Sequence, residues 1–296
     1  MPIRHSIKPR HTEIAPGFAV RRSLPSLASR SVGPFVFFDH FGPVDAKPGD
    51  DHDVRPHPHI GLATVTYLFE GAQLHRDSIG SVQRIEPGAV NWMTAGRGIV
   101  HSERTPPDLV DKERRMNGLQ LWVGLPYADE EAPPSFQHAA AADIPLWKDG
   151  ATRVRVLLGT FDGLRSPVKT FAPTQYLDVT TSSARFTLPA DFGDGQAERA
   201  IYALDPGLEV DGEPVAAEIL TVLEPGVDTL VTASGKVRYV VIGGAPLDGH
   251  RHMWWNFVSS RKERIEEAKR AWAAMSMGTI PGDDEEWIAL PDDARR

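Results

Sequence analysis

Short runs of strand-forming residues, separated by turn-forming residues, fill most of the chain between residues 20 and 245. The clearest runs are rich in Val, Ile, Phe, Tyr and Trp and lie at residues 35–38, 63–69, 89–93, 119–123, 154–158 and 237–242. Strands at this close spacing, with Gly, Pro, Asp and Asn between them, are typical of a β-sandwich or β-barrel. Alternating βαβ units would need helical segments between the strands. The chain is therefore predicted to be all-β.

Two similar pairs of segments predict that this β fold is duplicated. Residues 85–96 (IEPGAVNWMTAG) match residues 223–234 (LEPGVDTLVTAS) at an offset of 138, and five of the twelve positions are identical. Residues 67–71 (YLFEG) match residues 202–207 (YALDPG) at an offset of 135. Two matches in the same order at nearly one offset favour two β domains over the chance recurrence of a common Pro-Gly turn.

A polar stretch rich in Pro and Ala, residues 128–143, interrupts the strand pattern. Such a segment is typical of a connection between domains. The 296 residues are therefore divided into an N-terminal domain over residues 1–135 and a C-terminal domain over residues 136–296.

A helix is predicted over residues 259–277, in the second domain. Its apolar side chains fall on one stripe and its other face is charged; the stripe consists of Ile265, Ala268, Trp272 and Met275. Ser260 and Glu263 have the spacing of a capping box. We expect this helix to pack on the second barrel. The alternative is that the stripe binds a partner protein.

Composition excludes several kinds of site. The chain has no cysteine, so disulfides, thiolate metal sites and cysteine nucleophiles are ruled out. The net charge is −8 and no long Lys/Arg cluster occurs, which argues against direct binding of a nucleic-acid backbone. The sequence contains neither an apolar run of about 18 residues nor the apolar core of a signal peptide. A cytoplasmic protein that does not enter a membrane is therefore expected.

Two pairs of polar residues with the spacing i, i+2 are the strongest candidates for a functional site. His57 and His59 form one pair, and His101 and Glu103 form the other. In a strand, residues two apart point to the same face. If the pairs lie on neighbouring strands, three imidazoles and one carboxylate converge on one point. Such a set suits a divalent first-row metal ion, and an octahedral ion would keep two positions for water, dioxygen or a substrate oxygen.

The residues around these pairs resemble the pirin family of the cupin superfamily. The matching segments are residues 37–43 (FFDHFGP), 57–61 (HPHIG), 75–78 (HRDS) and 92–103 (WMTAGRGIVHSE). The resemblance is dense over residues 33–125 and looser through the second half. It implies two cupin-type (jelly-roll) β-barrels in tandem, with one metal ion per chain in the N-terminal barrel.

By this resemblance, the ligands of the ion are His57, His59, His101 and Glu103. The resemblance implies Fe²⁺ as the metal, and Mn, Ni, Cu, Co and Zn stay open because ligand type alone does not separate them. Many cupins place a Glu four or five residues after the His-x-His pair, but Ala63 and Thr64 occupy those positions here. The carboxylate comes instead from Glu103, as pirins arrange it.

The second half is expected to hold no metal ion. The two offsets carry the four candidate ligands onto Tyr239, Val241, Phe192 and Asp194. The C-terminal barrel is therefore predicted to be a structural partner of the first.

Metal-bound histidines usually donate their second N–H to a carboxylate or a carbonyl. Four residues are candidates for orienting the ligands in this way, namely Asp39, His40, His75 and Asp77. Hydrogen bonding within loops and turns is the alternative for each of them.

The resemblance implies two functions. Some bacterial pirins are similar to flavonol 2,3-dioxygenases, which open the ring of quercetin with dioxygen and release carbon monoxide. Here Glu103 would be the catalytic general base, and a small phenolic compound and dioxygen would be the substrates. Other pirins are similar to redox-responsive coregulators, so the alternative is a regulatory metal-binding protein that acts through protein partners. A Lewis-acid isomerase or hydrolase is a third possibility, because cupin chemistry is varied. We favour the oxygenase and expect a monomer.

Overall fold

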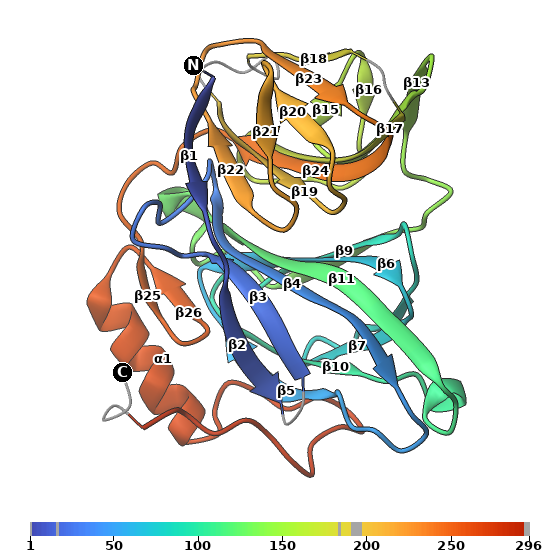
Figure 1. The fold of residues 1–296 in the computed structure, drawn as a ribbon. Coiled ribbons are helices and arrows are strands. Elements are labelled where there is room, and N and C mark those ends of the chain that lie inside the picture. Colours follow the sequence, from blue (N-terminus) through green and yellow to red (C-terminus); the bar gives the residue numbers. More distant parts are fainter. Residues whose placement is uncertain (1, 16–17, 183–184, 191–196, 293–296) are drawn as a thin grey trace. The chain divides into compact units, whose positions relative to one another are not determined.

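The computed structural model describes residues 2–15, 18–182, 185–190 and 197–292. The regular structure of these residues is mostly strands, together with one α-helix, α1 (Lys262–Ala273), and two short 3-10 helices, η1 (Pro107–Leu109) and η2 (Tyr127–Asp129) (Figure 1). All six predicted runs fall on strands. The predicted all-β class and the predicted C-terminal helix are therefore confirmed. Among the described residues, no helix is both long enough and apolar enough to span a membrane.

The chain forms two compact units, and each is assembled from separated segments. The N-terminal barrel consists of Thr12–Val20, His40–His138 and Asp248–Arg296. The C-terminal barrel consists of Met1–His11, Arg21–Asp39 and Ala139–Leu247. These units differ from the predicted continuous domains, residues 1–135 and 136–296. The first eleven residues group with most of the second half, and the segment from Asp248 onward groups with most of the first half.

Two sheets and a hairpin build the N-terminal barrel. Its seven-stranded sheet has the order β12–β9–β6–β11–β4–β3–β2, and its four-stranded sheet has the order β5–β10–β7–β8. The strands are β2 (Arg10–Ala15), β3 (Phe18–Leu24), β4 (Phe35–Ala46), β5 (Val54–His59), β6 (Leu62–Glu70), β7 (Gln73–Asp77), β8 (Val82–Ile85), β9 (Val90–Thr94), β10 (Ile99–Arg104), β11 (Arg114–Gly124) and β12 (Ser135–Ala139), with the hairpin β25 (His252–Trp254) and β26 (Phe257–Ser259). Strands β2, β3, β4 and β12 also contribute residues to the other unit.

The C-terminal barrel repeats this strand order. Its seven-stranded sheet runs β1–β22–β19–β24–β17–β14–β13, and its four-stranded sheet runs β18–β23–β20–β21. The strands are β1 (Ile3–Ile7), β13 (Leu146–Asp149), β14 (Thr152–Leu158), β17 (Thr174–Ser182), β18 (Phe186–Leu188), β19 (Glu198–Ala203), β20 (Leu208–Val210), β21 (Glu213–Val215), β22 (Leu220–Leu223), β23 (Thr229–Ala233) and β24 (Lys236–Gly244), with the short hairpin β15 (Thr160–Phe161) and β16 (Leu164–Arg165).

The two sheet orders correspond strand for strand, so β5, β6, β9 and β10 of one barrel are equivalent to β18, β19, β22 and β23 of the other. The match at offset 135 lies on equivalent strands, β6 and β19. The match at offset 138 is wrong, because it aligns the turn after β8 with the turn after β22. Both turns contain a Pro-Gly pair, and Gly88 and Gly226 both have positive φ angles. A left-handed turn position selects glycine wherever it occurs, so this likeness reflects turn geometry.

Each barrel has an apolar core. The C-terminal barrel buries a large cluster from both of its sheets, including Val156, Leu177, Ile201, Val231 and Tyr239. The N-terminal barrel buries a smaller cluster around Phe18, Phe41, Leu68 and Met116, and a second cluster that the C-terminal helix covers.

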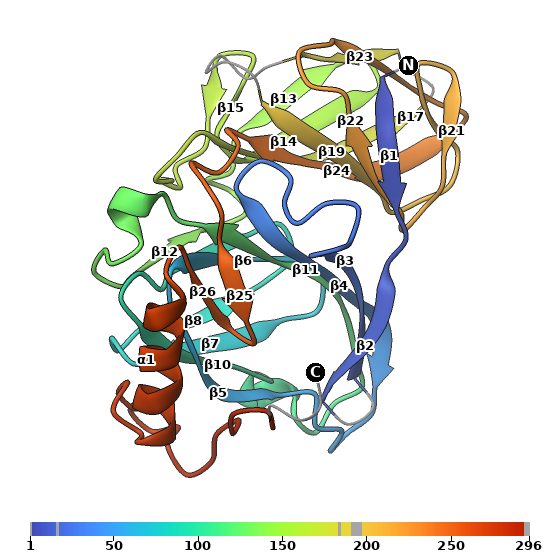
Figure 2. The same cartoon turned by 90° about the vertical axis from the view of Figure 1, so that its left-hand side faces the viewer.

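The expectation that the helix packs on the second barrel is wrong. Helix α1 buries Ile265, Ala268 and Trp272 against Ile60 and Val100 of the N-terminal barrel, as well as against Phe257 of the β25–β26 hairpin. Figure 2 shows α1 beside this hairpin. Three members of the predicted stripe are buried, whereas Met275 lies beyond the end of the helix and is exposed. Periodicity does not identify the surface that a stripe covers. The capping box is also wrong, because the N-cap is Arg261 and Ser260 binds Glu130 instead.

Candidate metal centre

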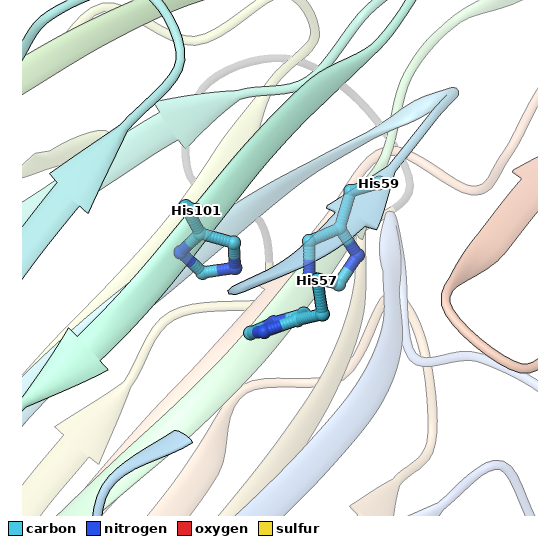
Figure 3. A group of neighbouring side chains, drawn as sticks. All are labelled: His57, His59 and His101. Carbon is cyan, nitrogen blue, oxygen red and sulfur yellow. The ribbon is translucent and has the colours of Figure 1, made fainter. Parts of the chain in front are cut away.

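Strands β5 and β10 bring the two predicted pairs together. They pair antiparallel, and His101 lies directly opposite His57. The ligand nitrogens of His57, His59 and His101 all lie within 4.8 Å of one another, and all three side chains are buried (Figure 3). The i, i+2 spacing has placed both imidazoles of β5 on the face that meets β10.

A bulge in β5 sets the register beside this triad. His101 is opposite His57, but Glu103 is opposite Val54, so three residue steps on β5 face two steps on β10. The extra residue lies at Arg55–Pro56. Pro56 has no N–H to donate, which suits it to a position where the ladder is interrupted. Bulges next to functional sites commonly redirect side chains, and here the Arg55 side chain reaches partly exposed carboxylates while His57 is buried.

Two backbone carbonyls orient the histidines of β5. His57 Nδ1 lies 2.8 Å from the carbonyl oxygen of Arg55, and His59 Nδ1 lies 3.0 Å from the carbonyl oxygen of Asn256. A carbonyl oxygen only accepts, so Nδ1 of each ring carries the proton and donates it. The Nε2 lone pairs of His57 and His59 are therefore available to a metal ion.

His101 has a different environment. Neither of its ring nitrogens has a hydrogen-bond partner among the described residues, although both are buried. Its Nδ1 lies 3.5 Å from Glu103 Oε1, without a hydrogen bond between them. The second carboxylate oxygen of Glu103 is likewise buried and unpartnered among the residues that the structure describes. Buried polar atoms without partners cost free energy, and a bound cation would satisfy them.

Gln120 and Thr66 hold the other side of Glu103. Thr66 Oγ1 donates to Gln120 Oε1 at 2.8 Å, so the amide nitrogen of Gln120 faces Glu103. Gln120 Nε2 donates to Glu103 Oε1 at 3.4 Å. Thr66 and Gln120 are cross-strand partners on β6 and β11. The two strands thus position the carboxylate from the seven-stranded sheet.

Burial controls the charges of the site. It lowers the pKa of His57 to about 4 and lowers the pKa of His59 and of His101 well below the ordinary value. All three imidazoles are therefore neutral at pH 7, the state that binds a metal ion. Burial also raises the pKa of Glu103 to about 8 in the absence of a cation. A divalent cation would favour its carboxylate form, because a nearby positive charge lowers the pKa of an acid.

The donor set therefore fits a divalent metal ion. His57 and His59 are neutral imidazoles whose tautomers are fixed by carbonyls. His101 and one oxygen of Glu103 are buried without partners among the described residues, and such an ion would bind all of these groups. Glu103 does not belong to the group of atoms within 4.8 Å, which contains the three histidines. Its role as a ligand stays a prediction.

The structure divides the four orienting candidates. His75 and Asp77 lie on β7, opposite Glu103 and His101 of β10. Their side chains are 3.0 Å apart, and the His75 ring centroid lies 5.4 Å from that of His101. Asp39 and His40 are engaged elsewhere. Asp39 accepts two hydrogen bonds from Arg22, and His40 pairs with Asn117.

Three residues at the site were missed in the sequence. Asn256 lies 197 positions from His59, and its contribution is a backbone carbonyl, which leaves no trace in residue type. Thr66 and Gln120 did leave a signal, because each is a polar residue inside a strand of mostly apolar residues. Polar residues at inward positions of a barrel strand indicate a site.

The equivalent positions of the C-terminal barrel are apolar. Phe186 of β18 faces Val231 of β23, as His57 faces His101, and Leu188 replaces His59. Ala233 stands where Glu103 stands. The predicted equivalents Tyr239 and Val241 lie on β24, a different strand, and Phe192 and Asp194 lie outside the described residues.

Comparisons with known proteins agree with this architecture. The Pirin family model matches residues 17–123, and the model of the pirin C-terminal cupin domain matches residues 176–278. A pirin-like protein of Caulobacter vibrioides is 43% identical over 279 residues, which cover 93% of this chain and 95% of that protein.

Two crystal structures from Acinetobacter baumannii, both of a quercetin 2,3-dioxygenase, are similar throughout. One has a TM-score of 0.90 at 33% identity and covers 99% of this chain and 96% of its own. The other has a TM-score of 0.86 at 25% identity and covers 94% of this chain and 98% of its own. The chain therefore belongs to the pirin family, and its two barrels are cupin domains in tandem.

Proposed function

We propose that this protein is a metal-dependent dioxygenase that acts on a flavonol such as quercetin or on a related small phenolic compound. The observation that carries the proposal is the buried group of three neutral imidazoles with Glu103 beside it. The likeness to a quercetin 2,3-dioxygenase of A. baumannii over 99% of this chain supports the reaction class.

In this proposal four side chains hold one ion, namely His57, His59, His101 and Glu103. Fe²⁺ is the first candidate, and Mn, Ni, Cu, Co and Zn are the alternatives to be tested. Bound there, the ion would act as a Lewis acid toward the phenolic oxygen of the substrate and lower the pKa of its hydroxyl group.

Glu103 is the proposed general base. When its bond to the ion loosens, its buried carboxylate takes the proton of the substrate hydroxyl. Gln120 donates to Oε1, and Oε2, which has no partner among the described residues, is the oxygen that would take the proton. The electron-rich phenolate then reacts with dioxygen, the ring opens and carbon monoxide leaves. Glu103 returns its proton as the product departs.

The first test is metal analysis of protein purified without a chelator. We expect one divalent ion per chain, and the His57→Ala variant is expected to contain less than a tenth of that amount, since ligand loss removes a bond that no neighbour replaces. Purified protein that contains no metal and takes up none of the six candidate ions would contradict the proposal.

The second test measures oxygen uptake with quercetin at saturating metal. Glu103→Gln is expected to lower the rate at least about 100-fold, because general acid–base groups typically contribute at least that factor. Glu86→Gln is the matched control, since Glu86 is an exposed glutamate of the same barrel. An unchanged rate in Glu103→Gln would remove the proposed role of Glu103.

Metal binding and oxygen uptake, together with a test of partner capture, distinguish the dioxygenase from the regulatory protein. Metal binding without oxygen uptake from any flavonol or simpler phenol would overturn the dioxygenase. Redox-dependent capture of a purified protein partner would then favour the regulatory protein.

A further inference from the structure

Residues 278–292, named here the C-terminal strap, follow helix α1 and lie along β5 and β10 of the same barrel. Ile280 of the strap is buried in the cluster that contains Ile60 and Val100. The backbone N–H of Ile288 donates to the carbonyl of Pro56 at 2.9 Å, and Trp272 Nε1 donates to the carbonyl of Ile288 at 2.9 Å. The strap is thus fixed at both of its ends to the strands that carry the candidate ligands.

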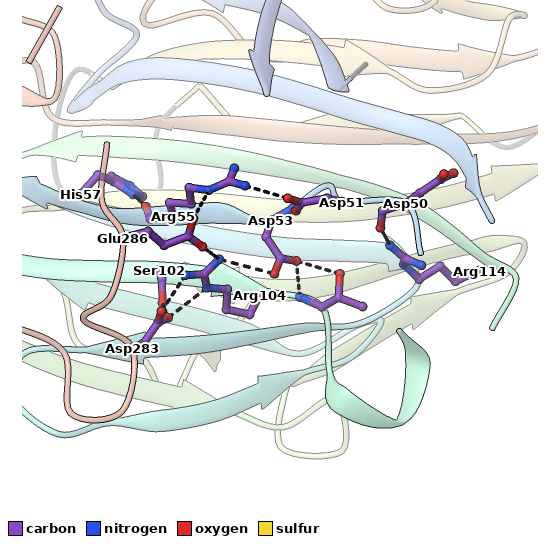
Figure 4. A network of polar contacts seen from close by, with 11 residues as sticks. Asp50, Asp51, Asp53, Arg55, His57, Ser102, Arg104, Arg114, Asp283 and Glu286 are labelled. Atoms are coloured by element: carbon purple, nitrogen blue, oxygen red, sulfur yellow. Dashed lines mark hydrogen bonds and ion pairs between the residues drawn. The ribbon is translucent and has the colours of Figure 1, made fainter. Parts of the chain in front are cut away.

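Two carboxylates of the strap bind the outer face of β10. Side chains alternate along this strand, so His101 and Glu103 are buried while Ser102 and Arg104 point to the other face. Arg104 donates to both oxygens of Asp283, at 3.0 and 2.6 Å, and Ser102 Oγ donates to Asp283 at 2.6 Å (Figure 4). Two parallel bonds to a guanidinium fix orientation as well as distance. Asp283 therefore accepts hydrogen bonds from the two residues that flank Glu103 in the sequence.

Glu286 joins β10 to the bulge of β5. One of its oxygens accepts from Arg104 Nη1 at 2.9 Å and the other accepts from Arg55 Nε at 2.5 Å (Figure 4). The carbonyl of Arg55 is the group that orients His57, and the carbonyl of the next residue, Pro56, is held by Ile288. A bulge lacks the regular ladder bonds that would otherwise fix its backbone. The strap supplies contacts in their place.

We propose that the C-terminal strap is a positioning element of the metal centre. Asp283 and Glu286 hold β10 and the β5 bulge in the register at which His57, His101 and Glu103 converge. These carboxylates touch neither the ion nor a substrate, and act through Arg104 and Arg55. The inference rests on the metal site proposed above.

The experiment compares the wild-type protein with the double variant Asp283→Asn/Glu286→Gln. Both proteins are stripped of metal and titrated with Co²⁺, whose visible absorption reports ligand geometry. We expect the Kd for Co²⁺ to rise 10- to 100-fold in the variant, the range typical of groups that orient metal ligands, and we expect the spectrum of the bound ion to change. Hydrogen exchange of the metal-free protein should be faster at the amides of β5.

Glu86→Gln/Asp108→Asn is the matched control. These two carboxylates flank Arg84 of β8, as Asp283 and Glu286 flank Arg104, and β8 is at the opposite edge of the four-stranded sheet. The control is expected to keep the Kd within twofold. Arg104→Lys, which keeps the charge and loses the planar fork, should weaken Co²⁺ binding in the same direction as the double variant.

The outcomes separate the two proposals. A double variant that binds Co²⁺ with the affinity and spectrum of the wild type, whatever its stability, would overturn the role of the strap and leave the metal site intact. Wild-type protein that binds neither Co²⁺ nor Fe²⁺ would overturn the metal site itself, and the strap inference with it.

Discussion

The two barrels of this chain share one strand order, but at one pair of equivalent inward positions the first barrel has polar side chains and the second has apolar ones. Where the N-terminal barrel has His57 facing His101, the C-terminal barrel has Phe186 facing Val231. The apolar pair belongs to a continuous core, whereas both ring nitrogens of His101 are buried without a hydrogen-bond partner among the described residues. The same fold thus accepts either interior. The barrel is a scaffold, and its chemistry depends on a few inward positions.

The largest expected effect comes from giving the first barrel the interior of the second. The double variant His57→Phe/His101→Val should lose its metal completely. His101→Val replaces two buried ring nitrogens that lack partners among the described residues, which should raise the free energy of unfolding of the metal-free form by about 1–3 kcal/mol. His57→Phe offsets part of this gain, because it removes the hydrogen bond from His57 to the carbonyl of Arg55. Metal analysis and urea unfolding of the stripped protein measure the two effects. Retention of one ion per chain would refute the assignment of these histidines.

The reverse exchange is the control for this comparison. Phe186→His/Val231→His places two imidazoles in the core of the C-terminal barrel, where they would have neither orienting carbonyls nor a carboxylate. We expect it to destabilise the protein by about 2–5 kcal/mol. Added metal should not restore the lost stability.

The buried ionisable groups of the metal site should make the stability of the metal-free protein depend on pH. The folded pKa of His57 is about 4, below its ordinary 6.5, so the unfolded state binds more protons between these values and stability rises with pH across this window. The folded pKa of Glu103 is about 8, above its ordinary 4.5, so its contribution is present below pH 4.5 and is lost as the pH rises to 8. Between pH 4.5 and 6.5 the effects of His57 and Glu103 oppose each other. The lowered pKa values of His59 and His101 add to the rise over this range, so the metal site stabilises the protein most near pH 6.5.

Glu103→Gln tests the upper part of this profile. Between pH 6.5 and 8 the metal-free wild type should lose about 2 kcal/mol through Glu103, since each pH unit corresponds to about 1.4 kcal/mol. The variant should lose none of this amount. Urea unfolding of both stripped proteins at several pH values measures the difference, and parallel profiles would show that Glu103 ionises normally.

A smaller effect is expected at Gln120. The equivalents of Thr66 and Gln120 in the second barrel are Ile201 and Val241, which face each other in the same way. Gln120→Leu removes the hydrogen bond to Glu103, and we expect the Kd for the metal to rise about fivefold, which corresponds to about 1 kcal/mol. Gln83→Leu on β8 is the matched control, and calorimetric titration of the metal is the measurement. Equal Kd values for the two variants would exclude a positioning role for Gln120.

The sequence was sufficient to predict the all-β class, the duplication and the approach of three histidines. These rest on local patterns, since a period of two places His57 and His59 on one face without knowledge of the rest of the fold. The offset at 138 failed because Pro-Gly turns recur between unrelated strands. The helix stripe was recognised, but its partner was not, because burial of a stripe says nothing about which surface buries it.

The parts of the site that were not predicted come from distant segments. Asn256 contributes a carbonyl that any residue type would carry, and Asp283 and Glu286 read as ordinary charges in an acidic segment. The two carboxylates have a role at the site only because the fold brings them to Arg104 and Arg55, and the sequence does not reveal this proximity. Inward polar residues such as Gln120 were visible in the sequence and would have extended the predicted site.

The distance along the chain between His59 and Asn256 has a consequence for biosynthesis. A ribosome adding about 5–20 residues per second needs on the order of 10–40 s to make the 197 residues that separate them. In the other direction, strand β1 leaves the ribosome early but pairs with β22, more than two hundred residues later. The segments of the C-terminal barrel are complete once Leu247 has been made, whereas the N-terminal barrel still lacks the segment from Asp248 onward. The nascent chain must stay unaggregated over that interval, and the carbonyl that orients His59 becomes available only after Asn256 has been added.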